Sequence, residues 1–220
     1  MPKLSIEPAL KQKCPRVALG LVTANVTVQE NSAAVQGEMQ HCESEILKLR
    51  DPRSVLESPK ILATRSGYKA LGKDPARYRG SAEALIRRIL SGKHLPQINT
   101  VVDIINLVSV ETRLSIGLYD LDHVKDDITF RTGRAGETYK GIGKYDLNLE
   151  DLPVFSDADG PHGSPTSDSE RTMVTLASTH VAAILISFVG VEALPSSCER
   201  TAALFAQYAD GQNAQIEIIQ

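Results

Sequence analysis

The chain has 220 residues, a net charge of −3, a pI near 6.0 and 42% apolar residues without any tryptophan. This suits one large domain or two small ones with a mainly aliphatic core, and the overall charge does not predict nucleic-acid binding. Cys14, Cys42 and Cys198 are far apart and odd in number, which argues against a disulfide framework or a cysteine-rich zinc site.

No signal peptide follows Met1, and the longest apolar stretch, residues 180–190, is too short to span a bilayer. We therefore expect a cytoplasmic protein with reduced thiols and no membrane partner. The chain lacks a dinucleotide fingerprint, a Walker loop and an HExxH motif, and its histidines do not pair at ligand spacing. We expect no cofactor, no metal and no DNA partner.

The first quarter of the chain predicts a strand and then a helix. Residues 16–29 are β-branched and partly alternating, which is typical of a strand. Residues 32–50 have apolar side chains at helical spacing, with Asn31 or Ser32 as a cap. Residues 59–68 predict a short strand or a loop that leads into a turn-rich connector.

Two helices are predicted in the middle of the chain. The first begins at Ser81, which we expect to be its N-cap, and Gly92 ends it. The second covers residues 96–109, with Pro96 in its first turn and a broad apolar stripe. Asp103 and Asn106 are three residues apart and share one face of this helix.

The pattern then changes to short strands, followed by a helix over residues 196–208 capped by Ser196 or Ser197. The predicted strands cover residues 114–121, 128–133, 152–158, 171–178, 180–189 and 215–219. Helices followed by a run of strands favour an α+β fold over a doubly wound one.

Basic residues are concentrated in one segment of the chain. Residues 65–93 contain eight basic residues against the two acids Asp74 and Glu83, a local charge of +6. Tyrosines at positions 68 and 78 alternate with the basic side chains, as in surfaces that bind RNA phosphates and stack on bases. The residues we expect to contact RNA are Arg65, Lys69, Lys73, Arg77, Arg79, Arg87 and Arg88.

The segment from Leu95 to Ala158 resembles a known family. Its motifs are LPQINTVVDIINLVSVE, SIGLYDLDHV, ITFRTGRAGETYKGIG and LPVFSDADG. They agree in order, spacing and residue type with the B3/B4 domain of the phenylalanyl-tRNA synthetase β-subunit. The segment upstream resembles that of free-standing B3/B4 proteins, so the resemblance covers roughly Ile61 to Gly190.

This resemblance implies an α+β fold of mixed β-sheets packed with helices around a central pocket. It implies one domain over residues 1–220, with a distinctive core at about 61–190, a strand–helix extension over 1–58 and the C-terminal helix over 196–208. In bacterial synthetases the domain hydrolyses tyrosine wrongly attached to phenylalanine tRNA. We therefore expect a tRNA-associated domain rather than a complete synthetase.

The resemblance also suggests site residues. Asp103, Asn106, Asp120, Glu137 and Asp157 keep the family's residue types, and Gly117 stands where the bacterial domain has histidine. The expected substrate-binding residues are Asp103, Asn106, Gly117 and Glu137, and the catalytic candidates are Asn106, Glu170 and Thr166. Asp120 and Asp122 are expected to stabilise a turn.

Three functions remain open on the sequence. The first is RNA association with hydrolysis of a mischarged aminoacyl-tRNA in trans. The second is a non-catalytic module that binds an amino acid or small metabolite, which the loss of the family histidine at Gly117 favours. The third is a protein-interaction domain with a relic pocket.

Overall fold

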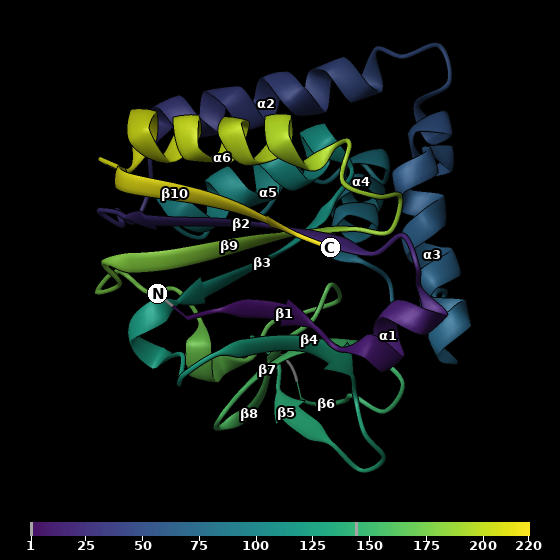
Figure 1. The fold of residues 1–220 in the computed structure, drawn as a ribbon. Coiled ribbons are helices and arrows are strands. Elements are labelled where there is room, and N and C mark those ends of the chain that lie inside the picture. The colour runs from purple at the N-terminus through teal and green to yellow at the C-terminus, as the bar shows by residue number, and fades with distance from the viewer. Residues whose placement is uncertain (1, 144) are drawn as a thin grey trace.

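A computed structural model describes residues 2–143 and 145–220 of the chain. Two four-stranded sheets lie one above the other, and most of the helices cover the outer face of the first sheet (Figure 1). This arrangement confirms the predicted α+β class.

The first sheet has the strand order β10-β2-β9-β3, and every neighbouring pair in it is antiparallel. Its strands are β2 (Ala18–Asn25), β3 (Ser115–Asp120), β9 (His180–Ser187) and β10 (Gln212–Ile219). The predicted strands at residues 16–29, 114–121, 180–189 and 215–219 are therefore confirmed. Strand β2, from the first part of the chain, lies inside the sheet between β10 and β9, so segments far apart in the sequence share one layer.

The second sheet has the order β1-β4-β7-β8, with β1 parallel to β4 and the other pairs antiparallel. Its strands are β1 (Leu4–Ile6), β4 (Ile128–Thr132), β7 (Pro153–Asp157) and β8 (Gly160–Gly163). A separate two-stranded hairpin is formed by β5 (Thr138–Lys140) and β6 (Asp146–Asn148).

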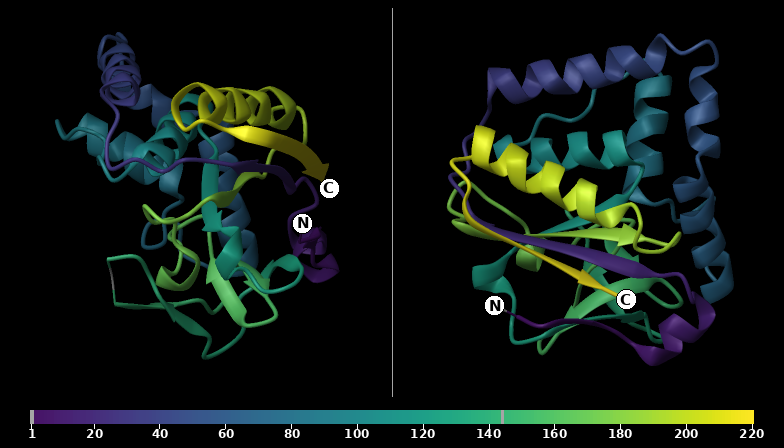
Figure 2. Two further views of the ribbon diagram at one scale, coloured as in Figure 1. Left: turned by 90° about the vertical axis from the view of Figure 1, so that its left-hand side faces the viewer. Right: turned by 45° about the horizontal axis from the view of Figure 1, so that its top comes forward.

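The helices α2, α5 and α6 lie over the first sheet, whereas α3 runs down one side of the molecule past both sheets (Figures 1 and 2). The helices are α1 (Pro8–Lys13), α2 (Ala33–Leu47), α3 (Pro59–Leu71), α4 (Ser81–Leu90), α5 (Thr100–Thr112) and α6 (Leu194–Tyr208). Short 3-10 turns are η1 (Pro52–Glu57), η2 (Leu121–His123) and η3 (Glu170–Thr172). Within the described residues, no helix combines the length and the apolar character needed to cross a membrane.

Both faces of the first sheet are covered, which makes β9 apolar along nearly its whole length. Side chains alternate between the two faces of a strand. Leu185 packs in a cluster with Ile104 of α5, while the adjacent Ile184 packs in a second cluster with Phe130 of β4. The first sheet therefore separates a helix-facing core from a core between the two sheets.

Residues 59–68, predicted as a short strand or loop, instead form most of helix α3. Ser58 caps this helix by accepting a hydrogen bond from the Ile61 amide, and Pro59 occupies its first turn. Serine before proline is a helix-start signal that outweighs the β-branched residues after it.

The prediction of a strand at residues 171–178 is wrong. Residues 170–172 form η3, and a turn follows in which the Ser178 amide donates to Thr175 O. The Arg171 guanidinium forms two hydrogen bonds with Asp157 of β7, which ties η3 to the end of that strand.

Three predicted helix starts need correction. Helix α5 begins at Thr100 with Asn99 as its cap, so Pro96 lies in the preceding loop. Helix α4 has Gly80 as its N-cap, and Ser81 is the first helical residue. Helix α6 begins at Leu194, which places Ser196 and Ser197 inside its first turn.

Candidate nucleic-acid interface

Three arginines of the basic segment converge on one buried carboxylate. The Arg65 and Arg87 guanidinium groups each lie 2.8 Å from Glu83 Oε1, and that of Arg79 lies 3.9 Å away. Arg87 stands one helical turn after Glu83 in α4, so helical geometry brings it to the side of Glu83, whereas Arg79 reaches Glu83 from the segment before the N-cap Gly80. We call Arg65, Arg79, Glu83 and Arg87 the arginine cluster.

The arginine cluster carries more positive charge than its one acid can neutralise. The Glu83 side chain is only 4% exposed, while those of Arg65, Arg79 and Arg87 are 32%, 45% and 44% exposed. Three cations on one anion leave a net charge of +2 that faces solvent. The buried acid also holds the long arginine side chains in place, which lowers the entropy lost when an anion binds them.

The other predicted RNA contacts divide into exposed and buried side chains. Lys69, Arg77 and Arg88 are exposed. Lys73 is 8% exposed and donates to the carbonyl oxygens of Asn148 and Glu150 at the end of β6. Lys73 therefore anchors the hairpin to the basic segment.

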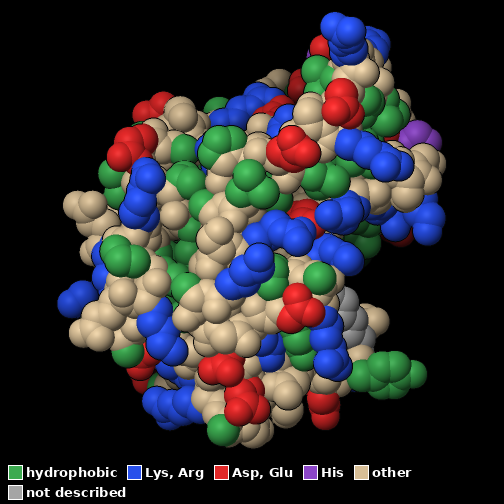
Figure 3. Space-filling model, turned by 90° about the vertical axis from the view of Figure 1, so that its right-hand side faces the viewer, with side chains coloured by type: hydrophobic (Ala, Val, Ile, Leu, Met, Phe, Trp, Pro, Cys, Tyr) green, Lys and Arg blue, Asp and Glu red, His purple; other side chains and the backbone are tan. Residues whose placement is uncertain are grey.

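Neither predicted stacking tyrosine presents an open ring. Tyr68 is 1% exposed, and its hydroxyl lies 2.9 Å from Thr166 Oγ1. Tyr78 is half-buried, with Lys73 Nζ 4.1 Å from its ring centroid. Figure 3 shows lysine and arginine side chains gathered across the middle of this side of the molecule. The exposed chemistry of this face is thus cationic.

The loop between Gly163 and Ser169 packs directly against the basic helices. The Ser81 amide of α4 donates to Pro165 O at 2.6 Å, and Thr166 is held by Tyr68 of α3. The amides of Thr166 and Ser167 both donate to Ser164 Oγ. These donors, which an oxyanion would need, are already engaged within the loop.

Comparison with known proteins places the chain in a family. A family model described as the B3/4 domain matches residues 63–209, about two thirds of the chain. The chain belongs to the B3/4 domain family. No curated protein sequence matches it.

The fold of this B3/4 domain is also found in a solved structure. It is similar to an N-terminal fragment of the phenylalanyl-tRNA synthetase β-subunit from Pyrococcus horikoshii, with a TM-score of 0.50 and 15% sequence identity. The match covers 99% of this chain and 50% of that one, so the chain spans about half the length of the fragment. At this identity the likeness concerns the fold.

Asp103 of the B3/4 domain is buried beside the loop before α5. It is 1% exposed, and its Oδ1 accepts a hydrogen bond from the Ile98 amide at 2.9 Å. Burial raises its pKa, while hydrogen bonds from the Ile98 and Asn99 amides act in the opposite sense. Asn106, one helical turn later, is half-buried. In this geometry the Asp103 carboxylate stabilises the loop and is closed to an α-ammonium group from solvent.

Gly117 lies on the opposite side of the first sheet, where it makes room for Tyr119. An added Cβ on Gly117 would lie 2.1 Å from the Tyr119 hydroxyl, and one on Gly163 would lie 2.0 Å from it. That hydroxyl donates to Asp168 Oδ1 at 3.0 Å, and burial raises the pKa of Tyr119 well above its ordinary value. Tyr119 packs in the core between the sheets, whereas α5 packs in the helix-facing core. The structure therefore does not bring Asp103 and Gly117 together.

The remaining predicted carboxylates all have protein partners. Glu137 accepts two hydrogen bonds of 2.8 Å from the Arg131 guanidinium, and Glu170 forms an ion pair with Lys140 at 2.9 Å. Asp120 accepts a hydrogen bond from the Asp122 amide, which agrees with the turn expected there. Within residues 2–143 and 145–220, no group of three or more metal-ligating side chains is found.

The sequence shows the basic segment, but the residue that pairs with three of its arginines was not predicted. Glu83 was counted only as one of the two acids in that segment. Its spacing of four residues from both Arg79 and Arg87 was a visible signal for an ion-pair cluster. The third arginine, Arg65, comes from α3 and could be added only once α3 was known to be a helix.

Proposed function

We propose that this B3/4 domain binds RNA, with a tRNA as its expected partner, through phosphate contacts made by the arginine cluster. The observation that carries the proposal is the convergence of Arg65, Arg79 and Arg87 on buried Glu83. The exposed Lys69, Arg77 and Arg88 extend the same basic surface.

The guanidinium group suits this role because its planar fork can donate two hydrogen bonds to one phosphate. A cluster held in place before binding loses little side-chain entropy when the phosphate arrives. Phosphate contacts fix the position of the RNA without reading its sequence. Phosphate contacts therefore support the binding of RNA in general. The expectation of a tRNA rests on membership of the B3/4 domain family.

We expect an Arg65→Gln/Arg87→Gln variant to bind tRNA about tenfold more weakly than the wild type, because two phosphate contacts are lost. The slope of log affinity against log salt should become shallower by about 1 to 2. Fluorescence anisotropy with a labelled tRNA at several salt concentrations measures both quantities.

A matched control is Lys125→Gln/Arg134→Gln, which removes the same charge from two exposed side chains outside the basic segment. It should keep nearly all of the affinity. Equal loss in both variants would reduce the effect to overall charge and contradict a local interface. In Arg65→Gln/Arg87→Gln, buried Glu83 loses two of its arginine partners. Urea unfolding of each variant therefore checks that the fold has kept its stability.

We also propose hydrolysis of a mischarged tRNA in trans, for which the 163–169 loop lies beside the basic helices, although its Thr166 and Ser167 amides already donate to Ser164 Oγ. Glu170 follows this loop directly, is half-buried with Lys140 Nζ 2.9 Å away, and is the carboxylate we assign to hold a water. We expect any turnover of mischarged tRNAs to fall at least tenfold in Glu170→Gln, whose RNA affinity should be unchanged. A lack of turnover with every mischarged tRNA under saturating protein would contradict hydrolysis and leave RNA binding intact.

A further inference from the structure

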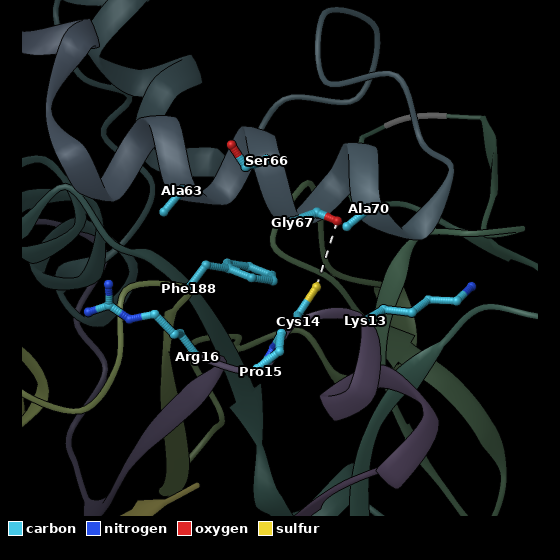
Figure 4. Close-up of a pocket in the computed structure, with 9 residues that line it drawn as sticks. All are labelled: Lys13, Cys14, Pro15, Arg16, Ala63, Ser66, Gly67, Ala70 and Phe188. Carbon is cyan, nitrogen blue, oxygen red and sulfur yellow. Dashed lines mark hydrogen bonds between the residues drawn. The ribbon is translucent and has the colours of Figure 1, made fainter.

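A second surface pocket lies between α1 and α3, apart from the arginine cluster. It has a volume of about 240 Å³. Figure 4 shows Ala63, Gly67 and Ala70 on α3 across from Cys14 and Phe188. The segment after α1 and the end of β9 thus form one wall, and one edge of α3 forms the other.

The walls are apolar and fixed. An added Cβ on Gly67 would lie 2.5 Å from the Phe188 ring, so the glycine allows that ring to pack closely against α3, where Phe188 is 8% exposed. The Cys14 thiol donates to Gly67 O at 3.8 Å, and burial raises its pKa, so it remains a neutral wall group. The pocket can therefore take an apolar group beside the contact between Phe188 and Gly67.

The rim of the pocket is cationic. Lys13 and Arg16 are exposed and extend from the two ends of the Cys14–Pro15 turn in opposite directions (Figure 4). Arg16 also donates to Val189 O, which steadies its side chain. Among the residues that the structure describes, no acidic side chain lines the pocket. The residues described in the lining offer an ammonium group no acidic partner. An anion attached to an apolar group would find a cation on either side, Lys13 or Arg16.

The geometry of α3 connects this pocket to the arginine cluster. With 3.6 residues per turn, Ala63, Gly67 and Ala70 share one edge of the helix, and Arg65 lies on the opposite edge facing Glu83. The exposed Lys69 lies between the two edges. A strand that crosses α3 would travel about 10 Å over exposed Lys69, Ser66 and Leu62.

We propose that the pocket receives one unpaired nucleotide of the bound RNA, with its base against Ala63, Ala70 and the accessible part of Phe188, and a phosphate at Lys13 or Arg16. This inference rests on the proposed RNA binding and adds a preference for RNA that has an unpaired end. Apolar contact with a base tolerates any sequence, so the pocket selects for an unpaired nucleotide.

The test uses the full chain and a short RNA hairpin with a four-nucleotide 3′ overhang. Each overhang position in turn carries either an intact base or an abasic sugar. We expect the intact overhang to bind about tenfold more tightly than the abasic form at one position. A 2-aminopurine placed there should change its fluorescence on binding.

The variant Ala70→Leu fills the pocket from an exposed helix position. It should remove the preference for the intact base and leave the affinity for abasic RNA unchanged. Ala203→Leu on α6 makes the same change at another exposed helix position and should keep the preference. Arg16→Gln should weaken both RNAs about threefold, because it removes one phosphate contact.

Several outcomes would overturn the inference. If intact and abasic overhangs bind equally, the pocket takes no base, although the arginine cluster can still bind RNA. If adenosine monophosphate stabilises the wild type but not Ala70→Leu, and no base preference appears on RNA, the site serves a free nucleotide. If the wild type binds no RNA, or if Arg65→Gln/Arg87→Gln binds RNA as tightly as the wild type does, the proposed function itself fails.

Discussion

A Gly133→Ala variant is expected to lose about 3 kcal/mol of unfolding free energy, the upper end for an overpacked site. Gly133 follows β4 and is bound on both sides, since its amide donates to Leu152 O and its oxygen accepts from the Asp151 amide. An added Cβ would lie 1.9 Å from Leu149 O. Because the obstructing atom belongs to the backbone, no rotamer change relieves the clash.

Urea unfolding followed by circular dichroism gives the free-energy difference. The matched control is Gly37→Ala in α2, where an added Cβ meets nothing within 4 Å. That change should stabilise the protein by about 0.5–1 kcal/mol, because alanine favours a helix interior more than glycine does. A Gly133→Ala protein with the wild-type urea midpoint would show that the contact between Gly133 and Leu149 is loosely packed.

The longer strands could be predicted because their residues carry the pattern themselves. β2, β3, β9 and β4 each have five or more residues with β-branched or alternating apolar side chains. The shortest strands have three or four residues and gave no pattern to detect. These are β1, β5, β6 and β8. They exist because a neighbouring strand offers them hydrogen bonds, and that information is not local.

Helix α3 shows how local signals compete. Residues such as Ile61, Thr64 and Tyr68 suggest a strand, yet they are the buried face of a helix that packs against the body of the protein. Their spacing of three and four residues fits a helix better than a strand. The misassignment also hid the link between Arg65 and Glu83.

The site residues were the hardest to predict, since a sheet has two faces and the sequence does not say which neighbour covers each. Asp103 and Gly117 were expected to share one pocket. They lie in cores on opposite faces of the first sheet, because α5 packs on one face while Tyr119 points to the other. In the arginine cluster, by contrast, the pair of Glu83 and Arg87 follows from spacing within α4, which the sequence does contain, while Arg65 joins it from α3.

The pair formed by Arg131 and Glu137 leads to a second large stability effect. Arg131 is 6% exposed, and both oxygens of Glu137 accept hydrogen bonds from its guanidinium. Removing one partner of such a pair leaves a buried charge without compensation. We therefore expect Glu137→Ala to cost about 3 kcal/mol of unfolding free energy at pH 7, whereas Glu57→Ala, at an exposed position, should cost less than about 0.5 kcal/mol.

The Glu137 effect should depend on pH in a defined direction. Hydrogen bonds from Arg131 lower the pKa of Glu137 below its ordinary value of 4.5, despite the opposing effect of burial. Its contribution is therefore fully present above that ordinary value and is lost as the pH falls through the lowered pKa. Urea unfolding at pH 7 and at about pH 3.5 should show the difference between wild type and Glu137→Ala shrinking in acid. If the difference stays constant, or if RNA affinity falls while stability does not, Glu137 acts on a ligand rather than on the fold.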